Sequence, residues 1–220
     1  LEIMEELRRG IREREGTFLD DEAKDFIRQG NQLTAVETAK GKRLKADGFV
    51  LAGGAWTPEM TCQLGLRLPM QGGKGYSLTL KKPAELPRLC SLLKEARVAV
   101  TPMGEKLRVG GTMEICGTDL SVSHKRVQGI IESFCRFFSA FKESDFEGIE
   151  PWSGLRPCTP DGLPCIGPIP GMQNATVATG HAMLGLSLGP VTGKLVTDLI
   201  TQGKPELEVD LLKLAPERFG

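Results

Sequence analysis

The chain opens on a helical pattern of apolar residues. Ile3, Leu7 and Ile11 recur every four positions among charged side chains, which predicts an amphipathic helix over residues 1–15. No capping signal precedes this helix, and Leu1 is not an initiator methionine. We therefore expect the sequence to be a fragment or a chain trimmed at its N-terminus.

After the helix, apolar positions fall in short stretches separated by turn signals. The dipeptides Gly30-Asn31 and Lys40-Gly41 are typical of hairpin turns. The continuous apolar run 49–52 is typical of a strand buried on both faces of a parallel sheet, and a short helix is expected from Thr57, with its hydroxyl as the cap. The hairpin strands are predicted at residues 23–29, 33–38 and 43–46.

The middle of the chain predicts a second group of strands followed by a helix. Glycines within residues 71–75 predict a turn that leads into a strand over residues 76–80. Residues 97–122 alternate as in an antiparallel sheet, and an apolar stripe over residues 124–141 predicts a helix packed on a core.

A segment of 32 residues, from Gly162 to Gly193, contains no Asp, Glu, Lys or Arg. Its seven glycines and four prolines exclude a membrane-spanning helix, because they would break the helix several times. We therefore expect a buried segment that contains a strand at 175–179 and a helix over about 184–200.

Composition narrows the function classes. The 220 residues include 28 basic and 28 acidic side chains and are 40% hydrophobic, which allows a substantial core and argues against disorder and against nucleic-acid binding through bulk charge. Six scattered cysteines and two histidines show no metal-ligand spacing. We expect reduced, mostly buried thiols and no metal site.

Three features could carry chemistry. The bend 52–56, with two glycines at the end of a strand, could admit a flat or phosphorylated ligand, or could only make room for packing. The junction 180–187 could present free helix amides to an anionic group, or could use small residues for tight packing. Arg156 could bind a carboxylate in two hydrogen bonds, or could be an ordinary surface arginine.

Taken in order, four segments resemble the C-terminal half of FAD-dependent amino-acid oxidoreductases: Ala46–Trp56, Gly73–Leu78, Gly154–Gly167 and Gly180–Ser187. The closest subgroup is the D-amino-acid dehydrogenase small-subunit type, related to D-amino-acid oxidase and glycine oxidase, and the resemblance covers nearly the whole chain. It implies a mixed α/β (α+β) fold, with a partial Rossmann-like FAD domain and a substrate domain on a mixed, largely antiparallel sheet. The expected limits are residues 1–70 for the partial FAD domain, 71–149 for the substrate domain and 150–220 for the return to the FAD domain.

The resemblance also implies roles for individual residues. Arg156 matches the family arginine that binds the substrate carboxylate, and Tyr76 and His181 lie within the matching motifs as further substrate-binding residues, although a packed tyrosine and a satisfied histidine are equally compatible with the pattern. The residues expected near the cofactor are Ala52, Gly53, Gly54, Trp56, Gly180, Met183, Leu184, Gly185 and Leu186. The family's GxGxxG phosphate loop is absent from the sequence, so only part of an FAD site is expected.

The reaction implied by the family is hydride transfer from the α-carbon of a D-amino acid or related amine to the flavin, which leaves an imino acid. Such a site mainly positions its reactants, so we expect no dedicated catalytic base. The resemblance implies a small-molecule substrate, an electron-acceptor subunit or quinone as partner, and a cytoplasmic location, at most peripheral to the inner face of the membrane. The alternative is a non-catalytic subunit or binding module of a multi-subunit amine dehydrogenase.

Overall fold

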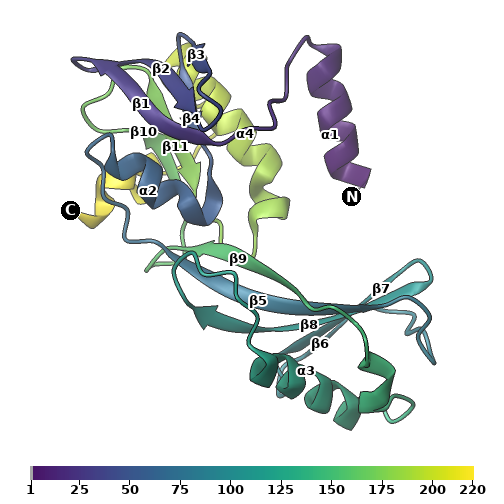
Figure 1. The fold of residues 1–220 in the computed structure, drawn as a ribbon. Coiled ribbons are helices and arrows are strands. Elements are labelled where there is room, and N and C mark those ends of the chain that lie inside the picture. The colour runs from purple at the N-terminus through teal and green to yellow at the C-terminus, as the bar shows by residue number, and fades with distance from the viewer. Residues whose placement is uncertain (1) are drawn as a thin grey trace.

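The computed structural model describes residues 2–220, and these form two bodies joined through a pair of long strands (Figure 1). One body holds two small sheets with helices around them, and the other is a five-stranded sheet covered on one face by a helix. The mixed α/β fold expected from the sequence is therefore confirmed.

The N-terminal part contains helix α1 (Glu2–Glu13) and an antiparallel sheet of order β1-β2-β3. Both hairpin turns form as predicted, with positive φ angles at Gly30 and Gly41. No residue of α1 is buried, so its apolar stripe remains exposed. The strands are β1 (Ala23–Gln29), β2 (Gln32–Thr38) and β3 (Arg43–Lys45).

The second small sheet has the order β10-β11-β4, in which β4 and β11 are parallel and β10 and β11 antiparallel. The prediction that residues 49–52 are buried on both faces is wrong, because β4 is an edge strand and Val50 is 46% exposed. Helix α4 lies along this sheet in Figure 1. These elements are β4 (Phe49–Leu51), η1 (Gly54–Trp56), α2 (Thr57–Cys62), β10 (Cys165–Pro168), β11 (Ala175–Thr179) and α4 (Gly185–Gln202).

The five-stranded sheet has the order β6-β7-β8-β5-β9 and is antiparallel throughout. Alternate residues of β5, β7 and β8 pack against helix α3 in the largest core cluster, which includes Val100, Val109 and Phe134. The other face of the sheet is not covered by α3 (Figure 1). The elements are β5 (Gln71–Leu80), β6 (Ser91–Leu93), β7 (Val98–Met103), β8 (Lys106–Ile115), α3 (His124–Phe137), η2 (Glu143–Phe146) and β9 (Trp152–Cys158), and two short turns close the chain as η3 (Leu211–Lys213) and η4 (Pro216–Phe219).

Two predictions for the middle of the chain need correction. The glycines of residues 71–75 form no turn but the first half of β5, where small residues let a neighbouring side chain lie across the strand. Helix α3 ends at Phe137, earlier than the expected residue 141, although Phe138 and Phe141 still pack on Phe134.

The charge-free segment is buried only in part. Strands β10 and β11 are largely buried, but Met183 is 72% and Leu186 68% exposed. The lack of charged residues shows that this surface is apolar, but it does not show that another element covers it. Among residues 2–220, no element covers this end of α4. The cysteines also differ from expectation: all six are free, but only Cys165 is buried.

The expected domain limits stay predictions. Strand β9 follows the limit set at residue 150, yet it pairs along its whole length with β5 of the five-stranded sheet. The chain therefore crosses from one body to the other through β5 and β9, which lie side by side (Figure 1).

Candidate active site

Three separate segments meet at the end of β9: the bend at η1, Arg156 and the turn before α4. The Thr179 hydroxyl donates to the Gly54 carbonyl at 3.1 Å, which fixes the bend beside the end of β11. The backbones of Cys158 and His181 form an isolated antiparallel β-bridge, and the Ala182 amide donates to the Pro157 carbonyl at 2.9 Å. The hydrogen-bonded backbone thus brings the two bends and the end of β9 to one place.

A second hydrogen bond to Thr179 fixes the position of α2. The sequence predicts that the Thr57 hydroxyl caps this helix, and this prediction is wrong. The hydroxyl donates instead to the Thr179 hydroxyl at 3.2 Å. Both threonine side chains are buried. This side-chain bridge joins η1 and α2 to β11, which keeps the bend in register with the sheet.

Arg156 lies across the glycine-rich half of β5. Its Nη1 donates to the carbonyls of Gly73 and Thr112, each at 3.3 Å. A Cβ atom placed on Gly75 would lie 2.5 Å from Nη2 and 2.8 Å from Cζ of Arg156, so only glycine leaves room for the guanidinium there. No carboxylate among residues 2–220 pairs with Arg156, which leaves hydrogen-bond donors free for a ligand.

The guanidinium borders a cavity of about 890 Å³ on the sheet. The cavity is also bordered by Met183 from the turn before α4, by Trp152 and Gly154 of β9, and by Met113 of β8. Its volume falls within the range of roughly 300–1,000 Å³ that is usual for small-molecule sites. The geometry thus brings Arg156 and the turn before α4 to one cavity.

Backbone strain occurs at one residue that borders this cavity and at another directly before Met183. Thr112 has a φ of 74°, unusual for a β-branched residue, at a register shift between β5 and β8. Ala182 has a φ of 47° in the turn that leads to α4. Strained residues of this kind persist where surrounding contacts hold them, often at functional sites.

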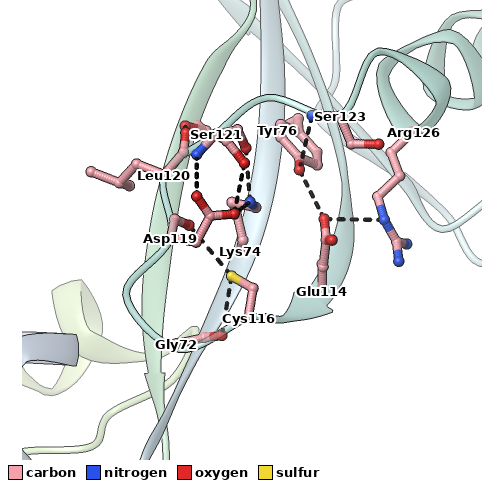
Figure 2. Close-up of polar contacts among 11 residues, drawn as sticks. Gly72, Lys74, Tyr76, Glu114, Cys116, Asp119, Leu120, Ser121, Ser123 and Arg126 are labelled. Carbon is pink, nitrogen blue, oxygen red and sulfur yellow. Dashed lines mark hydrogen bonds and ion pairs between the residues drawn. The ribbon is translucent and has the colours of Figure 1, made fainter.

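Tyr76 borders the cavity, but its hydroxyl is used on the α3 side of the sheet (Figure 2). It donates to Glu114 Oε2 at 2.8 Å and accepts from the Ser123 amide at 3.3 Å. Only 2% of the residue is exposed. The structure thus gives Tyr76 a full set of internal partners.

A buried lysine accompanies Tyr76 on that side. Lys74 donates to Asp119 Oδ2 at 2.8 Å and to the Ser121 carbonyl at 2.7 Å (Figure 2). The ammonium group beside Asp119 holds the pKa of that carboxyl well below its usual value, and the carboxylate in turn raises the pKa of Lys74. This pair ties the loop after β8 to the strand that carries Gly73 and Gly75.

His181 is half-buried, and its Nε2 lies 2.9 Å from the Thr192 hydroxyl of α4. Burial lowers the pKa of His181, because a low-dielectric environment disfavours the charged imidazolium. The bridge with Cys158 places this residue beside the end of β9.

The turn before α4 exposes backbone and apolar side chains together. Gly180 has a φ of 82°, and a Cβ there would lie 2.8 Å from the Thr159 side chain. Leu184 at the N-cap offers no side-chain hydrogen bond, and the first turn from Gly185 holds no acidic residue. The amides at this helix end therefore keep their partial positive charge available to a ligand.

The bend before α2 is similarly open on one side. Ala52 and Trp56 are exposed, and Gly54 has a φ of 57° with no atom within 4 Å of the place that a Cβ would take. Gly53 has a different role, because a Cβ there would lie 2.6 Å from Met60 Sδ of α2. Of the two glycines, Gly54 leaves the main chain accessible and Gly53 allows packing.

Sequence reasoning missed several residues that shape the cavity: Gly75, Thr112, Met113, Trp152 and Gly154. Strands β5 and β9 pair without a register shift, and Gly73 and Gly75 lie on the same face of the sheet. The alternation of these glycines with larger residues along the sequence could have indicated this arrangement. The strain at Thr112 has no sequence signal, because it depends on the register shift with β5.

Comparison with known proteins decides the family. Residues 1–199 match the family model described as FAD dependent oxidoreductase (DAO). The chain belongs to this family. The resemblance noted in the sequence is confirmed, and the family is FAD-dependent.

Curated proteins with similar sequences match most of the length of this chain. It is 38% identical over 189 residues to a D-amino acid dehydrogenase from Xanthobacter autotrophicus, which is 85% of this chain and 44% of that protein. It is 34% identical to a D-amino acid dehydrogenase from Granulibacter bethesdensis, over 98% of this chain and 51% of that protein. The chain thus spans about half the length of these curated relatives.

Solved structures show the same fold. Glycine oxidase from Geobacillus kaustophilus superposes with a TM-score of 0.76 at 28% identity, covering 91% of this chain and 53% of that one. L-proline dehydrogenase from P. horikoshii gives 0.76 at 25% identity, covering 94% of this chain and 56% of that one.

Residues 2–220 hold neither a membrane-spanning helix nor a cluster of metal ligands. None of the helices there is long and apolar enough to cross a bilayer. Within the same residues, no three side chains from His, Cys, Asp and Glu gather as metal ligands would.

The described residues fit one part of a flavin site. The uncapped amides at the start of α4 suit an electron-rich ring edge, and the open main chain at Gly54 suits close approach of a flat ligand. The sequence has no GxGxxG loop for a pyrophosphate.

Proposed function

We propose that the chain forms the substrate side, and part of the flavin side, of an FAD-dependent enzyme that oxidises a D-amino acid or a related amine. The observation that carries this proposal is that Arg156 and the turn before α4 border one cavity, while the η1 bend contacts β9, the strand that carries Arg156, and is hydrogen-bonded to Thr179 at the end of β11. The names of the curated relatives support an amino-acid substrate.

In this proposal Arg156 binds the substrate carboxylate. Its guanidinium is held by two carbonyls and has no acidic partner among residues 2–220, so it is oriented but still carries its charge toward the cavity. A planar guanidinium binds a carboxylate through two parallel hydrogen bonds, which fixes the ligand's orientation as well as its position.

The two bends would hold the flavin. FAD held there would supply the acceptor for a hydride from the substrate α-carbon. The amides of Gly185 and Leu186 would stabilise negative charge at the ring, and Ala52, Gly54 and Trp56 would lie along the cofactor. The exposed side chains of Met183 and Leu184 would exclude water beside it.

His181 and Tyr76 have positioning parts in this proposal. His181 holds the turn to α4 through Thr192, and Tyr76 connects the substrate sheet to α3. We assign neither of them proton transfer, because the chemistry requires orientation more than a base.

The test uses the full-length protein that carries this chain. Purified protein should show a flavin spectrum and should reduce an artificial dye with D-amino acids, glycine, sarcosine or hydroxyproline. A colourless protein, or one whose flavin is reduced by none of these compounds, would contradict the proposal and favour a non-catalytic binding module. Electron transfer to a quinone or partner subunit, and a cytoplasmic or peripheral location, stay predictions.

A further inference from the structure

The charged residues that border the cavity are all of one sign. No aspartate or glutamate among residues 2–220 borders it. The chain as a whole is neutral, with 28 basic and 28 acidic side chains, so this excess of positive charge is local. The basic residues at the cavity are Lys94, Arg97, Arg108, Arg126 and Arg156.

Most of these cations have no acidic partner. Arg126 is the exception, since its Nε lies 3.1 Å from Glu114. Within residues 2–220, Lys94, Arg97 and Arg108 form no salt bridge, and Arg108 has only the Thr79 hydroxyl at 3.4 Å. Uncompensated cations around a concave surface attract and retain anions.

Arg97 lies close to the strained bulge that holds Arg156. A Cβ placed on Gly111 would lie 2.9 Å from the Arg97 carbonyl, and the next residue, Thr112, accepts the hydrogen bond from Arg156. Arg97 itself has a φ of 54° in the turn between β6 and β7, where its amide donates to the Lys94 carbonyl. Arg97 and Arg156 thus contact neighbouring residues of β8, Arg97 through its carbonyl and Arg156 through its guanidinium, and both border the cavity.

We propose that the cavity selects amino acids whose side chain ends in a carboxylate, with Arg97 as a specificity-determining residue. This inference rests on the proposed function. Arg156 binds the α-carboxylate, and the turn that carries Lys94 and Arg97 then binds the second carboxylate. Leu92 and Leu93, which also border the cavity, can pack on the methylene groups between the two charges.

The test compares D-glutamate with D-glutamine, which have nearly the same shape but differ in charge. In the full-length flavin-loaded protein, we expect kcat/KM to be about tenfold higher for D-glutamate. Arg97→Gln should reduce this preference about fivefold, because the second carboxylate then loses its charged partner. Arg97→Lys should keep most of the preference.

Arg88→Gln is the matched control, since it removes the same charge from an exposed residue that does not border the cavity. It should leave the preference unchanged. The preference should also fall as NaCl rises from about 0.05 to about 0.5 M, because Arg97 is exposed and its field is screened. Equal or better oxidation of D-glutamine, or an equal loss for both substrates in Arg97→Gln, would overturn the inference.

A binding measurement separates this inference from the proposed function. Glutarate and valerate have the same number of carbons but carry two carboxylates and one. Tighter binding of glutarate, lost in Arg97→Gln, would support the inference even if no amino acid were oxidised. Equal binding of both acids in a protein that oxidises neutral D-amino acids would refute it and leave the proposed function standing.

Discussion

At the scale of single residues, the absence of a side chain at Gly75 is as important as the guanidinium of Arg156. The arginine lies flat across β5 because Gly75 presents no Cβ, and its hydrogen bonds to Gly73 and Thr112 hold it there. The sequence motif singles out Arg156 as a candidate substrate-binding residue. The alternation of glycines could have indicated a strand at Gly75, but its contact with Arg156 depends on the register with β9, in which Gly75 pairs with Gly154 and Gly73 with Arg156.

Substituting Gly75→Ala should therefore raise KM for the substrate by about 10- to 100-fold, since the new methyl group would displace the guanidinium. Steady-state kinetics of the full-length protein would measure this. Gly193→Ala in α4 is the control, because no atom lies within 4 Å of a Cβ there, and it should leave KM unchanged. An unchanged KM in Gly75→Ala would show that the observed position of Arg156 is not needed.

A second residue-scale prediction concerns His181 and pH. Its pKa lies below the usual value of about 6.5 because of burial, so the folded protein binds fewer protons than the unfolded chain as the pH falls through that range. The stability that neutral His181 contributes is therefore present above about pH 6.5 and is lost as the pH falls below it. Denaturant unfolding at several pH values should show a smaller acid-side loss in His181→Gln than in the unmodified protein. His124→Gln, at an exposed position, is the control, and parallel pH curves for His181→Gln and the unmodified protein would contradict this role of burial.

At the scale of elements, the strands and helices that follow a clear period were predictable, and their surroundings were not. The hairpins of β1 to β3, the β7–β8 pair and α3 follow from alternation or from an apolar stripe. The glycines in the first half of β5 predict a turn but form a strand, because glycine favours both turns and the close approach of a neighbour. The apolar composition at the start of α4 predicts burial, whereas Met183 and Leu186 are exposed, because composition does not show which element covers a segment.

The Lys74–Asp119 pair gives a prediction about how β5 is held. Only 2% of the Lys74 side chain is exposed, against 53% of the Asp119 side chain. Asp119→Asn leaves a buried ammonium without its anion, whereas Lys74→Met leaves a carboxylate that water can reach. Thermal unfolding should therefore show a larger drop in Tm for Asp119→Asn than for Lys74→Met, and the reverse order would contradict the arrangement in Figure 2.

At the scale of the whole molecule, the two bodies in Figure 1 meet where the site forms. Strands β5 and β9 bring the substrate sheet to the end of β11, and the backbone contacts of His181 and Ala182 close the junction. The order of motifs along the chain indicated the family, but only the fold shows that the three segments are neighbours. That arrangement is what the proposed site requires, with Arg156 on the substrate side and the two bends on the cofactor side.

The most direct test of this central claim is anaerobic reduction of the flavin in the full-length protein, followed by its absorbance as a D-amino acid is added. In Arg156→Leu, the concentration that gives half the maximal reduction rate should rise on the order of 100-fold, because the carboxylate loses a charged partner, while FAD remains bound. An unchanged half-saturating concentration in Arg156→Leu would contradict the assignment of this cavity as the substrate site.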